Sequence, residues 1–212
     1  MRLRNVKNAS SKVESSAYII TNPKEYRGKF ATLFKKNQPL SLEIGMGKGD
    51  FLIGMAERCP DVNFIGIERY PSVILRAVQK LEGKDLPNVK LICMDAKEVD
   101  EVFDHEISTL YLNFSDPWPK TRHTKRRLTS DVFMAKYESV FLGQGRVIQK
   151  TDNIDLFAYS IEQLSKHDYM LEKVTLNLAK TDLFNVETEY EHKFKKLGAK
   201  INYVEAVKRP KK

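Results

Sequence analysis

The sequence predicts an α/β fold, with a mostly parallel seven-stranded sheet, an antiparallel edge strand and helices on both faces. Its 212 residues suit one full domain with additions. From residue 40 onward, short apolar runs alternate with amphipathic stretches of helical period. Such alternation is typical of βαβ units. We expect a basic N-terminal arm and helix over residues 1–36 and a single domain over residues 37–212.

The individual elements follow from local patterns. The first twenty residues are polar and basic without periodicity, which is typical of a flexible arm. Asn22 and Pro23 suit the start of a helix over residues 24–36. Apolar runs predict strands over residues 40–47, 62–68, 89–96, 109–114, 145–151, 169–178 and 199–207, the last two suiting an antiparallel edge. Helical periodicity predicts helices over residues 49–60, 70–83, 129–143, 153–167 and 189–198.

The net charge of +8 is distributed in blocks. Residues 1–36, 117–150 and 192–212 carry +7, +6 and +7, whereas residues 37–116 and 151–191 carry −6 each. Segregated basic charge indicates a surface for a polyanion such as RNA. We expect the three basic blocks on one side of the molecule.

Several classes of protein are disfavoured. Apolar runs such as residues 51–56 are far shorter than the roughly 20 residues needed to cross a bilayer. The first residues also lack the apolar segment of a secretory signal, so a cytoplasmic location is expected. Cys59 and Cys93 are far apart in the sequence, and the four histidines are scattered along it at positions 105, 123, 167 and 192. This spacing argues against a disulfide scaffold, a metal site or a Cys–His nucleophile.

The turn after the first expected strand reads EIGMGKGD and begins at Glu43. A phosphate-binding loop would need Ser or Thr where Gly49 follows the lysine. The dinucleotide pattern matches at Gly45 and Gly47, but Asp50 replaces its third glycine. Because Glu43 would repel a pyrophosphate, the turn suits a cationic ligand that carries an amino acid ammonium group.

Two further carboxylates end the next two expected strands. Glu68 is placed to accept hydrogen bonds from ribose hydroxyls, and Asp95 is placed to accept one from an adenine amino group. Each alone could be a solvated carboxylate at a strand end. Together with Glu43 they suit S-adenosylmethionine better than NAD, and the pattern resembles the Rossmann-like class I fold of S-adenosylmethionine-dependent methyltransferases.

The fourth expected strand runs into FSDPWPKTRHTKRR, residues 114–127. Two prolines around the single tryptophan give a stiff loop, although this could be an ordinary proline-rich turn. Between Lys120 and Arg127 lie five cations and one histidine without an acid. Such a cluster binds phosphates.

This string resembles the signature of bacterial tRNA (guanine-N7-)-methyltransferases, which form N7-methylguanosine at the variable-loop guanine, position 46 in the tRNA convention. EIGMGKG, Glu68 and the TEYE segment at residues 188–191 match the same family. The resemblance implies tRNA as partner, Asp116 as the active-site carboxylate, and S-adenosylmethionine contacts from Glu43, Gly45, Gly47, Glu68, Asp95 and Asp116. It implies guanine contacts from Lys120, Asp152, Thr188, Glu189, Tyr190 and Glu191. It also implies RNA contacts from Arg122, His123, Thr124, Lys125, Arg126 and Arg127.

Simpler interpretations remain open at some of these positions. Thr188 and Glu191 have the spacing of a helix capping box, and Asp152 could cap the following helix. Other classes of protein also remain open: a class I methyltransferase for another RNA or for a small molecule, an RNA-binding protein without enzymatic activity, and an NAD dehydrogenase. The chain could act as a monomer or as a homodimer.

Overall fold

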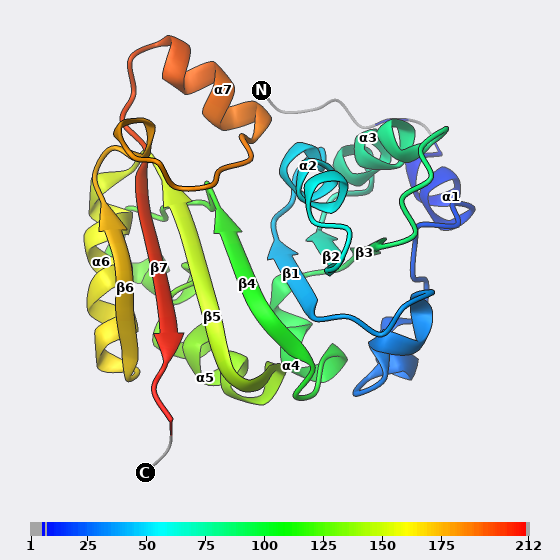
Figure 1. Ribbon diagram of the computed structural model, residues 1–212, viewed down its shortest axis with the longest axis horizontal. Helices are drawn as coiled ribbons and strands as arrows, with labels where there is room; N and C mark the ends of the chain where they lie inside the picture. Colours follow the sequence, from blue (N-terminus) through cyan, green and yellow to red (C-terminus); the bar gives the residue numbers. More distant parts are fainter. Residues whose placement is uncertain (1–5, 7, 211–212) are drawn as a thin grey trace.

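One sheet with the strand order β3-β2-β1-β4-β5-β7-β6 forms the centre of the computed structural model, which describes residue 6 and residues 8–210 (Figure 1). Its strands are β1 (Leu40–Ile44), β2 (Asn63–Glu68), β3 (Val89–Cys93), β4 (Ile107–Asn113), β5 (Phe141–Thr151), β6 (Tyr169–Thr175) and β7 (Asn202–Lys208). Strand β7 is antiparallel to β5 and β6, and the other neighbouring pairs are parallel. The predicted fold is confirmed, with the antiparallel strand one position inside the edge strand β6.

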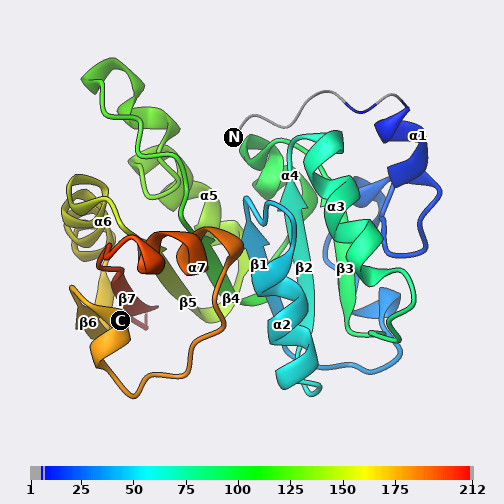
Figure 2. The ribbon, with the colours of Figure 1, turned by 90° about the horizontal axis from the view of Figure 1, so that it is seen from above.

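Helices cover both faces of this sheet. Helices α2 (Asp50–Arg58) and α3 (Pro71–Leu81) lie on one face, and α4 (Val99–Val102), α5 (Asp131–Val140) and α6 (Ile154–Lys166) lie on the other (Figure 2). Each face has its own hydrophobic cluster, because α2 and α3 bury side chains such as Leu52 and Ile74, whereas α5 and α6 bury Phe133 and Phe157. Over the described residues, no helix combines the length and apolar character that crossing a membrane requires.

The expected helix over residues 24–36 is wrong. Two short 3-10 turns stand there, η1 (Pro23–Tyr26) and η2 (Phe30–Leu33). Gly28 between them has φ of 73°, a left-handed conformation that interrupts a helix. The carboxylate of Glu106 accepts hydrogen bonds from the backbone N–H groups of Gly28 and Phe30, both at 2.9 Å. A distant acid thus replaces the helical partners of these two groups.

The expected flexible arm lies partly outside the described residues, but residues 8–20 pack against the domain. Helix α1 (Ala9–Glu14) contacts α3 and buries Val13 to 1% exposure. Ile20 then donates a backbone hydrogen bond to Leu91 in β3 at 2.9 Å. The arm therefore covers the outer edge of the sheet at β3.

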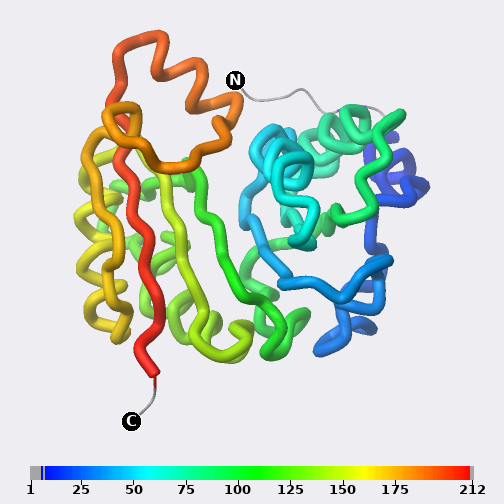
Figure 3. The backbone as a smooth tube through the Cα atoms, in the orientation of Figure 1, coloured from blue at the N-terminus to red at the C-terminus, as the bar shows by residue number. Residues whose placement is uncertain are grey.

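The segment between β6 and α7 (Glu189–Lys196), residues 176–188, is called the strap below. Figure 3 shows the strap running from the end of β6 across the sheet toward β4, where the chain turns into α7 and returns to β7. The strap includes the short turn η5 (Leu178–Lys180). This excursion brings the start of α7 to the carboxyl ends of the parallel strands, where ligands of such sheets bind.

Candidate functional site

A cleft of about 840 Å³ opens at the carboxyl ends of β1 and β4, where the strand order reverses. Its walls come from the turn after β1, the starts of α2 and α3, the end of β4 with its loop, and the start of α7. The predicted site residues that line it are Glu43, Gly45, Gly47, Asp116, Thr188, Glu189 and Tyr190. The fold therefore brings together the expected cofactor carboxylate, the loop of residues 114–119 that contains the DPWP motif (the DPWP loop) and the TEYE segment.

The glycine-rich turn gives the cleft a floor of backbone. Gly45 and Gly47 have φ of 77° and 57°, which residues with a side chain rarely adopt. The N–H groups of Gly45 and Met46 donate to the carbonyl of Ile67 in β2 at 2.9 and 3.0 Å. Because a Cβ would meet nothing within 4 Å at either glycine, the space beside them is open to a ligand.

Glu43 provides a buried carboxylate at the cleft. Its side chain is 2% exposed, and Oε1 accepts a hydrogen bond from Asn113 Nδ2 at 2.8 Å. Burial raises the pKa of Glu43 to about 7, while Asn113 and Lys150 act in the opposite direction. Among the described residues, neither Glu43 Oε2 nor Asn113 Oδ1 has a partner. Two buried acceptors that lack donors fit a cationic N–H donor, such as the methionine ammonium of S-adenosylmethionine.

Glu68 and Asp95 lie at neighbouring strand ends but do not line the cleft. The Glu68 carboxylate accepts from the backbone N–H groups of Gly47 at 3.2 Å and Tyr70 at 3.0 Å, and burial raises the pKa of Glu68. Asp95 caps the turn η3 (Ala96–Glu98), accepting from the N–H of Lys97 at 3.0 Å, and pairs with Arg69 at 3.5 Å. Both carboxylates thus stabilise local backbone around the site.

The DPWP loop is held in a strained conformation. Phe114 and Trp118 have φ of 51° and 42°, and such positions cost on the order of 1–3 kcal/mol each. Arg127 braces the loop, because its Nε donates to the carbonyl of Pro117 at 2.9 Å and its Nη2 donates to that of Trp118 at 3.3 Å. Its guanidinium also lies 4.4 Å from the ring centroid of Tyr159. These hydrogen bonds turn the Arg127 guanidinium inward, where it holds the loop that presents Asp116, and the RNA contact expected of Arg127 stays a prediction.

The rest of the cationic segment, residues 120–126 (called the basic loop below), faces outward. It forms the turn η4 (Thr121–Arg126), and Lys120, Arg122, Lys125 and Arg126 are exposed. Arg126 stacks over the Trp118 ring at 4.9 Å, and His123 packs edge-on against the same ring. Across the described part of the chain, none of the four exposed cations is paired with an acid, so all of them are available to an anion.

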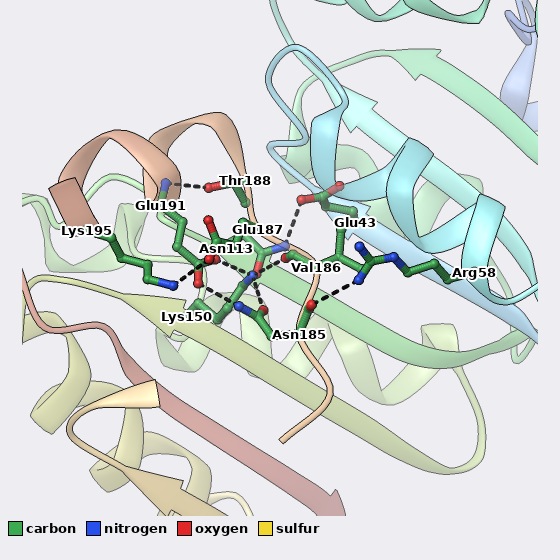
Figure 4. Close-up of polar contacts among 10 residues, drawn as sticks. All are labelled: Glu43, Arg58, Asn113, Lys150, Asn185, Val186, Glu187, Thr188, Glu191 and Lys195. Carbon is green, nitrogen blue, oxygen red and sulfur yellow. Dashed lines mark hydrogen bonds and ion pairs between the residues drawn. The ribbon is translucent and has the colours of Figure 1, made fainter. Parts of the chain in front are cut away.

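The TEYE segment starts α7 and forms half of the expected capping box. Thr188 Oγ1 accepts from the N–H of Glu191 at 2.8 Å. The Glu191 carboxylate does not return to Thr188 but accepts from Lys150 Nζ at 2.8 Å and Asn185 Nδ2 at 2.7 Å (Figure 4). This difference places Glu191 inside the protein at 1% exposure, while Tyr190 reaches the cleft.

Asp152 lies beside this segment. Tyr190 donates to Asp152 Oδ2 at 3.4 Å, and its ring stacks on Phe194 at 4.0 Å. The interpretation of Asp152 as the cap of the next helix is wrong, because Asn153 caps α6 by accepting from the N–H of Leu156 at 2.8 Å. Asp152 therefore keeps a carboxylate oxygen within hydrogen-bond distance of the Tyr190 hydroxyl.

The sequence prediction missed Asn113 and Lys150. Asn113 ends β4 in the same way that Glu68 ends β2, so its position at a strand end could have identified it as a site residue. Lys150 lies in the apolar run of β5 but is 2% exposed, and its partners come from residues 185–191. Only the folded strap reveals that contact.

Solved structures share this architecture. An antibiotic-related methyltransferase matches with a TM-score of 0.62 at 15% identity, covering 87% of this chain and 92% of the other. The 16S rRNA methyltransferase KamB matches with a TM-score of 0.64 at 12% identity, covering 86% and 94%. The strand order is that of the class I methyltransferase fold, which these solved structures share.

Sequence relatives define the family more narrowly. Residues 37–204 match a family described as putative methyltransferases. The tRNA (guanine-N(7)-)-methyltransferase of Geobacillus thermodenitrificans is 46% identical over 213 residues, covering 99% of each chain. That of Bacillus subtilis is 47% identical over 190 residues, covering 89% of each. The chain belongs to the tRNA (guanine-N7-)-methyltransferase family, which confirms the expected resemblance.

Proposed function

We propose that this chain transfers the methyl group of S-adenosylmethionine to N7 of the guanine at position 46, in the variable loop of tRNA. The observation that carries this proposal is the position of Asp116. Asp116 lines the same cleft as Glu43, and the loop that follows it carries the exposed cations Lys120 and Arg122. A site for a cationic methyl donor and a surface for a polyanion therefore meet at one carboxylate. Relatives that cover 99% and 89% of the chain are named tRNA (guanine-N(7)-)-methyltransferases, which supports this proposal.

The residues of the first turn suit the donor. Glu43 and Asn113 would hold the methionine ammonium through their unpartnered oxygens, and the backbone at Gly45 and Gly47 would pass close to the ligand. We propose that Glu68 accepts from the ribose and that Asp95 exchanges its contact with Arg69 for the adenine amino group. When bound, S-adenosylmethionine supplies a methyl group on a positively charged sulfur.

The acceptor chemistry asks little of the protein beyond placement. Guanine N7 has an in-plane lone pair and no hydrogen, so no base has to remove a proton. Correct placement can supply up to roughly 7–11 kcal/mol of the barrier reduction. Positive charge moves toward the guanine during transfer, and the carboxylate of Asp116 would stabilise that charge. The guanine itself would contact Lys120, Asp152 and residues 188–190.

The RNA surface extends on both sides of the cleft. We propose that it consists of the exposed part of the basic loop, with His123 and Thr124, together with Lys193 and Lys196 of α7. Binding of tRNA implies action in the cytoplasm. All of the proposed contacts come from one chain, so each copy would be catalytically complete whether it acts alone or as a homodimer.

Methyl transfer can be measured directly. Unmodified tRNA transcript incubated with S-adenosylmethionine labelled in the methyl group should become labelled. Replacing Asp116 with alanine should lower turnover by about 100-fold or more because charge stabilisation is lost. Labelling of small phenols or amines instead of tRNA would establish a small-molecule methyltransferase, and an absence of donor binding would leave only an RNA-binding protein.

A further inference from the structure

Lys150 is a buried cation that the proposed chemistry does not use. It lies near the end of β5, is 2% exposed, and directs all three ammonium donors to one segment. Nζ donates to Asn185 Oδ1 at 2.9 Å, to the carbonyl of Val186 at 2.8 Å and to Glu191 Oε2 at 2.8 Å (Figure 4). Burial lowers the pKa of Lys150, and the carboxylate of Glu191 counteracts this effect. A buried ammonium with a complete donor set fixes the strap to the sheet.

Glu191 is engaged as completely as Lys150. One carboxylate oxygen accepts from Lys150, and the other accepts from Asn185 Nδ2 at 2.7 Å. Lys150, Asn185 and Glu191 thus form a closed hydrogen-bonded triangle, with Glu191 at 1% exposure. With both oxygens occupied inside the protein, Glu191 is not available to a guanine in the cleft, whereas Thr188 and Tyr190 line it.

The same lysine also contacts the other wall of the cleft. Its backbone carbonyl accepts from the N–H of Phe114 at 2.8 Å, at the start of the loop that carries Asp116. Its ammonium lies 4.7 Å from the ring centroid of Phe51, a residue of the cleft wall. Lys150 therefore links the strap to both the donor side and the loop of Asp116.

We propose that Lys150 and Glu191 are a pair of positioning residues that fixes Thr188 and Tyr190 in the cleft, and that Glu191 acts through Lys150 without touching the guanine. This inference rests on the proposed function for its catalytic consequence. It deepens that function by dividing the TEYE segment into residues that contact the guanine and one residue that holds them in place.

A double-mutant cycle tests the pair, using K150M, E191L and K150M/E191L. Each single change leaves a buried polar group unpaired and should lower kcat for tRNA by about 100-fold, the effect of displacing contact residues by about 1 Å. The double variant should show the same loss and not the product of two losses, because the residues act as a unit. The thermal stability of the double variant should be higher than that of either single variant, since no buried charge is left unpaired. Stability would then recover while kcat stays low, which distinguishes a positioning role from a purely structural one.

A matched control is K136M, which removes the lysine of the distant Lys136–Asp100 ion pair and should leave kcat within about twofold of wild type. Wild-type turnover in the double variant would show that the pair only supports the fold. A loss of kcat in the double variant equal to the product of the two single losses would show that Glu191 touches the guanine itself. The same conclusion would follow if E191L lost activity and K150M did not.

Amide hydrogen exchange gives a readout that does not depend on activity. In K150M/E191L, the hydrogen-bonded amides at the start of α7, those of residues 191 and 192, should exchange at least about tenfold faster than in wild type, since the contacts that hold this end of the strap are gone. Unchanged protection would overturn the positioning role. A wild-type chain that fails to methylate tRNA would instead overturn the proposed function, and the exchange measurement would still decide the role of the pair.

Discussion

Buried acceptors without donors are the most informative single groups in the cleft. An unpaired buried polar atom costs about 1–3 kcal/mol, so Glu43 Oε2 and Asn113 Oδ1 form an unfavourable arrangement unless a ligand supplies a donor. A cationic amine does so and also favours the ionised form of Glu43. The affinity for the donor should therefore depend on the protonation of this one carboxyl group.

The pKa of about 7 for Glu43 sets the pH range over which stability and donor affinity should change. The unfolded chain loses this proton near pH 4.5, so raising the pH from 4.5 to 7 destabilises the ligand-free protein. Binding of a cation has the opposite preference, because it favours the carboxylate. We expect affinity for S-adenosylmethionine to be about tenfold weaker at pH 6 than near pH 7.5, with a proton released on binding at pH 6.

Calorimetry in two buffers of different ionisation enthalpy measures that proton. The variant E43Q should bind the donor more weakly and release fewer protons at pH 6. Equal proton release by wild type and E43Q would contradict the role assigned to Glu43 and would point to another group, such as Glu68, whose pKa is also raised by burial.

Single residues also show where sequence reasoning reaches its limit. Glu43 was predicted at the cleft because it ends a strand, whereas the place of Asp116 was implied by the family resemblance, and both residues line the cleft. The role of Arg127 was not predictable, since a run of cations does not reveal which member turns inward to bind carbonyl groups. Burial of Glu191 depends on Lys150, which is 41 residues away in the chain.

The strap packs closely against helix α2 at Gly54. A Cβ built on Gly54 would lie 2.7 Å from Val186 Cγ1, which is too close for two carbon atoms. Val186 is 6% exposed, and its carbonyl is one of the acceptors of Lys150. The absence of a side chain at Gly54 therefore lets the strap reach the site.

The variant G54A should destabilise the protein by about 1–3 kcal/mol, the usual effect of overpacking. Shortening the opposing side chain should relieve the clash. The free energy of unfolding of G54A/V186A should therefore lie within about 1 kcal/mol of that of V186A alone. Chemical unfolding of the four proteins measures this cycle. If G54A and V186A were simply additive, the close approach of strap and helix would not exist in solution.

At the scale of elements, periodicity predicted the sheet and its flanking helices well, and it failed where a tertiary contact replaces a local one. The pattern of residues 24–36 suits a helix, but Glu106 captures the backbone around Gly28. The short helix α1 lies in a polar segment without periodicity and is ordered by its contact with α3. No local signal encodes either partner.

Over the whole molecule, the expected single basic side is only partly formed. The cations of the basic loop and of α7 lie at the cleft end of the sheet. Because β7 is antiparallel to β5, Lys208 lies at the opposite end, as do Lys35 and Lys36 before β1. Of these two groups of described cations, the first is the one placed to bind a tRNA that delivers a guanine to the cleft.

Charge reversal separates the two ends. R122E/K125E should weaken tRNA binding and reduce the slope of log K against log salt by about 1.5, the contribution of two phosphate contacts. The control K35E/K36E makes the same change in net charge at the far end and should alter that slope by less than about 0.5. Donor affinity should be unchanged in both variants. Equal loss of tRNA binding would indicate that only net charge matters.

The proposed function requires the cleft to deliver a methyl group to one atom of one base. Unmodified tRNA treated with the enzyme and S-adenosylmethionine can be reduced with borohydride and cleaved with aniline, which breaks the chain at N7-methylguanosine. We predict one new cleavage, in the variable loop at guanine 46, that requires both the donor and Asp116. Methylation without cleavage, or cleavage at a different guanine, would show that the chain does not methylate N7 of guanine 46.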